Sequence, residues 1–132
     1  MNLITVARRQ KEFPAAHRYL NAYRAVDELF ELDRSNGLLL GLMLAQDEGD
    51  TDRTFDLLDA YIDARLSYTL NYQKNPFFAG VQTHVPTKNE IIETHRLTLR
   101  SLEEDAQYAP MRGDPRFQAA LDRFRSLISP KA

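Results

Sequence analysis

Hydrophobic side chains recur every three to four residues along almost the whole chain, which is the spacing of one face of an α-helix. On this basis we expect helices over residues 3–11, 15–32, 37–47, 52–73, 88–105 and 115–128. The run from Leu38 to Ala45 is apolar on every side, which predicts a core helix buried between its neighbours. No alternating pattern long enough for a sheet accompanies these periods. The pattern therefore predicts an all-α fold, an antiparallel array of five to six helices.

Polar residues mark where several of these helices begin. Thr87 stands three residues before Glu90, which is the pattern of a capping box. Asp114 comes directly before a proline, which is a strong start signal for the last helix. For the apolar helix at 37–47 we expect Ser35 or Asn36 to be the N-cap.

The length of 132 residues fits one domain, so we expect a single helical domain over residues 1–132. Residues 75–87 contain two prolines and a glycine and lack a helical period, which predicts a loop inserted into the array. The amphipathic segment at about 114–128 is expected to be a C-terminal capping helix.

An internal repeat relates the first two pairs of expected helices. Residues 16–26 align with 54–64 at an offset of 38, with Leu20 on Leu58 and Tyr23 on Tyr61, and the same offset also aligns the preceding helices. A fainter third copy follows near the C-terminus. The alternative is a chance likeness between amphipathic helices, which all share leucine and alanine at a period of 3.6 residues.

Two segments resemble tetratricopeptide-repeat (TPR-like) proteins. The first is a helix that ends at Gly49, followed by an Asp/Thr turn and a helix with the pattern Leu-Leu-x-Ala-Tyr. The second, residues 111–121 (MRGDPRFQAAL), is similar to the closing segment of bacterial TPR-containing regulators. The resemblance implies helix-turn-helix repeats and the binding of a protein or peptide on a helical surface, without catalysis.

Composition narrows the chemistry. The chain has no cysteine, which excludes disulfides, Cys-ligated metals and a cysteine nucleophile. Its three histidines have no partner ligand three or four residues away, so we expect no metal and no cofactor. A net charge of −2 argues against nucleic acid as a partner. No apolar run approaches the length of a membrane span, and we expect a cytoplasmic protein without membrane contact.

Candidate binding residues cluster around the loop at 75–87. Phe77 and Phe78 are adjacent aromatic residues in a Pro/Gly segment, and they either fold back on the core or contact a partner or a second subunit. The other candidates are Tyr68, Tyr72, His84 and His95. An acidic stripe from Asp52 to Asp63 is either a solvated face or a docking surface for a basic partner.

These observations predict a non-enzymatic interaction or sensory module of TPR-like type, which binds a protein segment or associates with itself as a homodimer. The alternative is a small helical enzyme or ligand-binding sensor, with its site near the 75–87 loop. No residue arrangement typical of a catalytic site is found, so no catalytic residue is assigned.

Overall fold

The computed structural model describes residues 3–67 and 74–128. Every regular element in these two ranges is helical, which confirms the predicted all-α class. The chain divides into two compact units, residues 1–61 and 62–132, and the boundary falls within the fourth α-helix. We refer to them as the first and second units. No helix within the described ranges is both long enough and apolar enough to cross a membrane.

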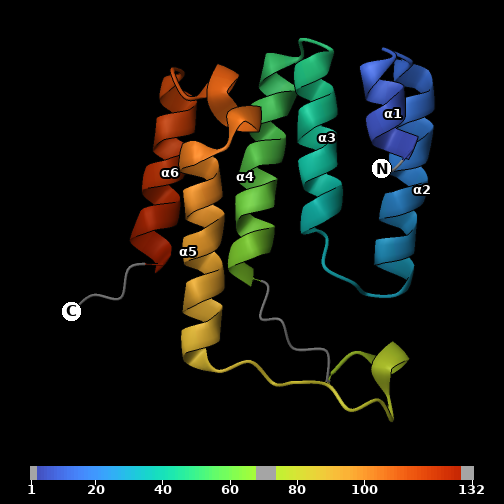
Figure 1. Cartoon of the computed structure of the whole chain (residues 1–132), viewed down its shortest axis with the longest axis vertical. Coiled ribbons are helices and arrows are strands. Elements are labelled where there is room, and N and C mark those ends of the chain that lie inside the picture. The colour runs from blue at the N-terminus through green and yellow to red at the C-terminus, as the bar shows by residue number, and fades with distance from the viewer. Residues whose placement is uncertain (1–2, 68–73, 129–132) are drawn as a thin grey trace. The chain divides into compact units, whose positions relative to one another are not determined.

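Figure 1 shows the helices in chain order. They are α1 (Leu3–Arg9), α2 (Phe13–Leu29), α3 (Ser35–Asp47), α4 (Thr51–Ser67), the 3-10 turn η1 (Pro76–Phe78), α5 (Lys88–Glu104), the 3-10 helix η2 (Ala106–Met111) and α6 (Pro115–Ile128). The predicted starts of the α-helices agree with these bounds to within two residues. The predicted continuation of α4 to residue 73 lies outside the described residues.

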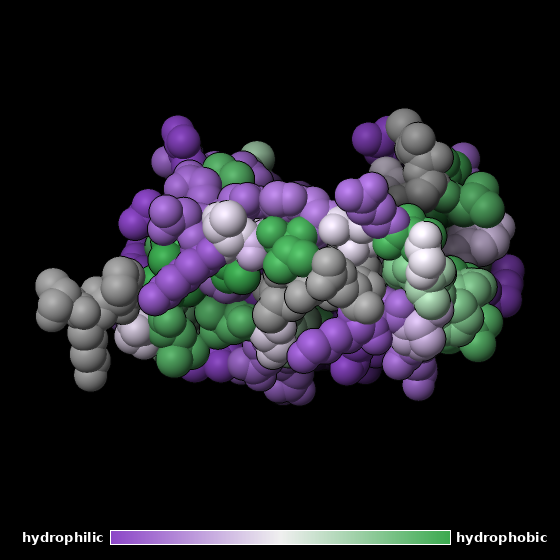
Figure 2. All heavy atoms as spheres, turned by 90° about the horizontal axis from the view of Figure 1, so that it is seen from below, coloured by the Kyte–Doolittle hydropathy of each residue, from purple (hydrophilic) through white to green (hydrophobic). Residues whose placement is uncertain are grey.

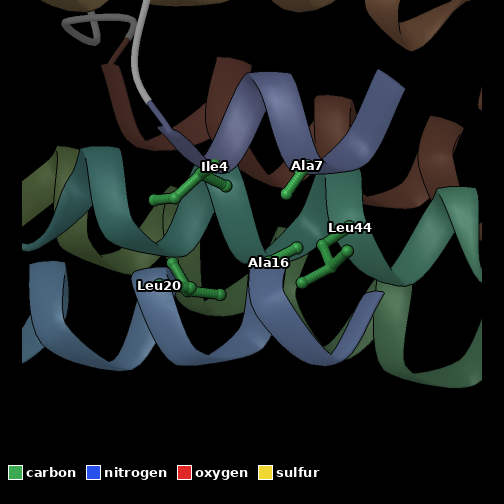
Figure 3. Packing of buried hydrophobic residues seen from close by; sticks show 5 residues of the cluster. All are labelled: Ile4, Ala7, Ala16, Leu20 and Leu44. Carbon is green, nitrogen blue, oxygen red and sulfur yellow. The ribbon is translucent and has the colours of Figure 1, made fainter. Parts of the chain in front are cut away.

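The core of the first unit lies where α1, α2 and α3 meet. Its buried cluster consists of Ile4 and Ala7 from α1, Ala16 and Leu20 from α2, and Leu44 from α3. Figure 3 shows these five side chains pointing toward one another from the three helices. The alanines let the helices approach closely, and the larger side chains fill the space between them.

The turns between α1 and α2 and between α3 and α4 are built in the same way. Lys11 and Gly49, 38 residues apart, both have a positive φ, of 57° and 75°. After each of them, one residue further on, a backbone N–H donates to the carbonyl of Ala7 or of Ala45, in both cases over 2.9 Å. This is the Schellman arrangement that ends a helix through a left-handed residue.

Burial follows the same offset of 38. Ile4 and Leu42 are both buried, and so are Leu20 and Leu58. The helix bounds repeat as well, because Phe13–Leu29 moved by 38 residues gives Thr51–Ser67. The first two hairpins are therefore one structural unit used twice, which a chance likeness between amphipathic helices does not explain. The faint third copy lacks this turn, since the 3-10 helix η2 connects α5 to α6 instead.

Three predicted local features change or gain detail. Helix α3 begins at Ser35, so neither Ser35 nor Asn36 is its N-cap; instead Asp33 accepts hydrogen bonds from the Ser35 backbone and hydroxyl groups. The predicted caps at Thr87 and Asp114 are confirmed, because each side chain accepts a backbone N–H of the following helix. The segment at 75–87 is not wholly irregular, since it contains η1, and the connector before α6 contains η2.

The second unit contains the end of α4 with α5, η2 and α6. Its buried side chains include Leu102 of α5 and Phe117 of α6, and Tyr108 of η2 lies with its ring centroid 6.2 Å from that of Phe117. Arg123 of α6 forms an ion pair with Asp63 over 2.6 Å. The end of the acidic stripe is thus paired within its own unit.

Candidate functional site

An apolar groove runs along α2 beside the start of α1, within the first unit. It has a volume of about 390 Å³ and is lined by Leu3, Ile4, Tyr19, Ala22, Tyr23, Val26 and Asp27. Figure 2 shows that hydrophobic side chains lie exposed among the hydrophilic ones on the face seen in that view. Six of the seven lining residues are apolar or aromatic, so the groove is suited to apolar side chains.

The groove is exposed although its residues are large and hydrophobic. The exposed fractions are 63% for Leu3, 49% for Val26 and 37% for Tyr19. Leu29 and Phe30, on the last turn of α2 and just beyond it, are exposed as well. Single exposed hydrophobic residues are common, but a continuous strip of them beside a groove is typical of an interaction surface.

The position of this groove follows from the internal repeat. In the second hairpin, a Cβ placed on Gly41 would lie 3.5 Å from a Cδ atom of Leu57 in the same hairpin. It would lie equally far, 3.5 Å, from the Cδ2 atom of Leu20, which belongs to α2 of the first hairpin. Leu20 of α2 therefore packs into the notch between α3 and α4. Moved back by 38 residues, Gly41 and Leu57 become Leu3 and Tyr19, which line the groove. The groove is thus the first hairpin's copy of a surface that receives a helix in the second hairpin.

Gly41 is not a point of unusually close approach, because a Cβ there would meet both leucines at an ordinary van der Waals distance. The close approach occurs at Gly37 instead, where a Cβ would lie 2.9 Å from Cγ of Arg24. The aliphatic part of Arg24 thus packs directly over the first turn of α3.

Asp27 is the charged residue of the groove. Its Oδ2 atom is buried without a hydrogen-bond partner and lies 3.8 Å from the Cβ position at Gly37. Partial burial, together with the negative charge of Asp33, raises the pKa of the Asp27 carboxyl above its usual value. Asp27 also lines a second, more polar hollow of about 210 Å³, with Arg24, Glu28, Arg34 and Leu38.

The predicted residues of the 75–87 loop lie in a different unit from the groove. Phe77 is 53% exposed in η1, whose N-terminus is capped by the Asn75 side chain, and Phe78 is half-buried. His84 is exposed and lies 2.8 Å from a carboxylate oxygen of Glu90. Hydrogen bonding to His84 lowers the pKa of the Glu90 carboxyl. Tyr68 and Tyr72 lie outside the described residues.

The surroundings of His95 differ from those of the loop residues. It is buried on α5, and its ring meets that of Phe124 edge to face at a centroid distance of 6.2 Å. Its Nδ1 atom has no hydrogen-bond partner. Burial, and secondly the positive charge of Arg65, lower the pKa of the imidazole. His95 is therefore neutral near pH 7 and belongs to the packing of the second unit.

Among residues 3–67 and 74–128, no group of three or more histidine or acidic side chains is placed to hold a metal ion. The chain matches no protein-family model, no curated protein and no solved structure. The assignment of function consequently depends on the geometry of the chain itself.

Sequence reasoning did not identify the groove. The apolar residues from Ala16 to Leu29 on α2 form a single stripe in the sequence, yet only Ala16 and Leu20 are buried, and Tyr19 and Val26 face the groove. The available signal was the width of the stripe. It continues through Leu29 and covers more of the helix than one neighbouring helix can bury.

Proposed function

We propose that this chain is a protein-interaction module whose groove along α2 receives an amphipathic helix of a partner protein. The observation that carries the proposal is the repeat relation of the groove. The equivalent surface of the second hairpin, at Gly41 and Leu57, is filled by Leu20 of a neighbouring helix. An open copy of a helix-binding surface is best completed by another helix.

The groove also has the chemistry of a helix-binding site. Amphipathic helices bind grooves through apolar side chains spaced three, four and seven residues apart. Burying apolar surface contributes roughly 25 cal/mol per Å², and tyrosines such as Tyr19 and Tyr23 are frequent interaction hot spots. The TPR-like resemblance points to the same class of function, because such repeats bind protein segments on their helices.

The enzyme or sensor alternative has less support in the described residues. It requires His84 or His95 beside a carboxylate in an enclosed site. The carboxylate at His84 belongs to Glu90, and both groups are exposed. His95 is enclosed, but the neighbours that act on it are Phe124 and the cation Arg65.

The test is a selection of helical peptides against the whole chain. A display library of about 18-residue peptides, all built on one helical scaffold with randomised surface positions, serves as the probe. Binders are then measured by fluorescence anisotropy against wild type and against Val26→Glu, which places a charge in the groove. Leu97→Glu, at an exposed leucine on α5, is the matched control.

We expect the selected peptides to bind wild type and the Leu97→Glu variant alike, and to lose at least tenfold in affinity on Val26→Glu. Binders that ignore Val26→Glu contradict the proposal. If their binding is lost instead in a Phe77→Ala/Phe78→Ala variant that melts like wild type, the site is the 75–87 loop.

A further inference from the structure

We propose that the helix received by the groove carries an arginine or lysine that pairs with Asp27. This inference rests on the proposed function and specifies the partner: a basic amphipathic helix, rather than an acidic or purely apolar one. It is carried by the placement of one carboxylate at the edge of an apolar groove and by the absence of any cation paired with it among the described residues.

Among the described residues of the first unit, 3–61, no positive charge is paired with the carboxyl of Asp27. Its Oδ2 atom is buried and accepts no hydrogen bond. The charged neighbour that affects it is Asp33, which has the same sign and, with burial, raises the pKa of the Asp27 carboxyl. In a protein surface of this kind, a carboxyl normally has a donor or a cation beside it.

The nearby arginines do not supply that cation. Arg24 is one turn before Asp27 on α2, the spacing at which ion pairs form on a helix, yet its side chain packs over Gly37. Arg34 lines the polar hollow that Asp27 shares, and it forms no ion pair with Asp27. Neither arginine therefore offsets the rise that burial causes in the pKa of Asp27.

Docking of a helix in the groove would increase the cost of leaving the Asp27 carboxylate without a positive charge. A helix laid on Tyr19, Tyr23 and Val26 removes water from the side of the groove that Asp27 lines. An acidic residue on that helix would repel the carboxylate, and an apolar one would leave it desolvated and unpaired. A guanidinium or ammonium group satisfies both requirements. Its long apolar stem covers the groove, and its charged head compensates the carboxylate from the groove side, since the Oδ2 atom itself is buried toward Gly37.

The position of Asp27 also determines where the basic residue must lie. Asp27 is eight residues after Tyr19, which is about 12 Å along the helix axis. The basic residue is therefore expected at one end of the docked apolar stripe, about two turns from the side chain that contacts Tyr19. Whether the basic residue lies at the N-terminal or the C-terminal end of the apolar stripe gives the orientation of the partner helix.

The experiment repeats the peptide selection with a focused library. The probes are helical peptides with a constant leucine stripe, in which one flanking position at each end is varied among Lys, Arg, Gln and Glu. They are sorted separately on wild type, on Asp27→Asn and on Asp27→Lys. Asp27→Asn keeps the size of the side chain and removes only the charge, and melting curves verify that each variant is folded.

On wild type we expect Lys or Arg at one end, with an affinity about 10- to 100-fold above that of the matched Gln peptide. On Asp27→Asn this preference should disappear, and on Asp27→Lys it should change to Glu. Higher salt should weaken the Lys peptide more than the Gln peptide on wild type.

A preference for Lys that is unchanged on Asp27→Asn overturns the inference. Groove binders without any basic preference also overturn it, but they leave the proposed function standing. If no selected peptide loses affinity on Val26→Glu, both the inference and the proposed function are overturned. A wild-type chain that is dimeric by light scattering, and monomeric as Val26→Glu, shows a second copy in the groove and overturns the partner helix.

Discussion

The hairpins α1–α2 and α3–α4 share a turn, an arrangement of buried residues and a spacing of 38 residues, yet they expose different faces. At equivalent positions, Leu3 is exposed where Gly41 is buried, and Val26 is exposed where Ala64 is partly covered. The second hairpin has Gly41 where Leu20 of a neighbouring helix packs. The first has large apolar residues and no described helix in that place.

The comparison shows that one sequence pattern can build either a packed interface or an open groove. In repeat proteins each unit buries its apolar face on the next. The first hairpin leaves such a face open along Tyr19, Tyr23 and Val26. This open face is the surface that we propose as the binding groove.

The largest expected effect tests whether the buried positions of the two hairpins are equivalent in energy. Leu42 is fully buried in α3, so Leu42→Ala should lower the free energy of unfolding by about 2–5 kcal/mol, measured by urea denaturation. Ile4→Ala, the equivalent change in α1, should cost less, because α1 has only seven residues and α3 has thirteen. Equal losses of unfolding free energy at both positions would contradict the expected energetic difference between the two hairpins.

A second test uses the position equivalent to Asp27, which is Arg65, and its neighbour His95. Because the folded-state pKa of His95 lies below that of the unfolded chain, the unfolded state binds more protons below about pH 6.5. The free energy of unfolding should therefore be unaffected by His95 above that pH. Below it, the free energy of unfolding should fall as the pH decreases, by up to about 1.4 kcal/mol per pH unit.

The measurement is thermal or urea unfolding between pH 7 and pH 5. His95→Leu should flatten this part of the profile. Arg65→Met should flatten it in part, because the arginine is the second cause of the shift. Parallel profiles for wild type and His95→Leu would show that another group causes the dependence.

The shared turn provides a third test, with opposite signs at equivalent positions. Gly49→Ala places a side chain at a φ of 75° and should cost about 1–2 kcal/mol. Lys11 already bears this strain, so Lys11→Gly should change stability by less than about 1 kcal/mol and in the favourable direction. Chemical denaturation of both variants provides the comparison. Destabilisation by Lys11→Gly would show that its side chain has a contact that outweighs the strain.

The smallest expected effect concerns the free chain at Asp27. Asp27→Asn should raise stability slightly at pH 7, by less than about 1 kcal/mol, because the carboxyl is only partly buried. Since its folded-state pKa is raised, the advantage should shrink as the pH falls through that pKa and vanish below about pH 3.9. Differential scanning calorimetry at pH 7 and pH 3 measures the difference. An equal gain at both pH values would rule out the charge as its cause.

Much of the helical layout could be predicted from local signals. The capping residues Thr87 and Asp114 act on their own helices, and Gly49 ends α3 within one turn, so neighbouring residues contain the information. Local signals do not predict η2, because Pro110 and the absence of an apolar period favour an irregular segment over a 3-10 helix. The N-cap of α3 was misjudged because Asp33 lies further before the helix than the usual cap.

The candidate site was beyond local reasoning for a different reason. The loop at 75–87 was singled out by composition, but Tyr68 and Tyr72 are outside the described residues, and His84 and His95 have unlike surroundings. The groove, in contrast, uses residues that are ordinary members of an amphipathic stripe. Only the three-dimensional arrangement separates Leu20, which packs on α3, from Tyr19, which does not.

The sequence by itself determined the helical class, the main helix boundaries and the spacing of 38 residues, because hydrogen bonding and capping act within a few residues of one another. Only the tertiary structure decided which apolar side chains are covered, since burial depends on neighbours far away along the chain. It also decided that no cation of the described residues pairs with the Asp27 carboxyl, although Arg24 stands at ion-pair spacing on the same helix. Packing at Gly37 directs that arginine elsewhere, and no local pattern contains this information.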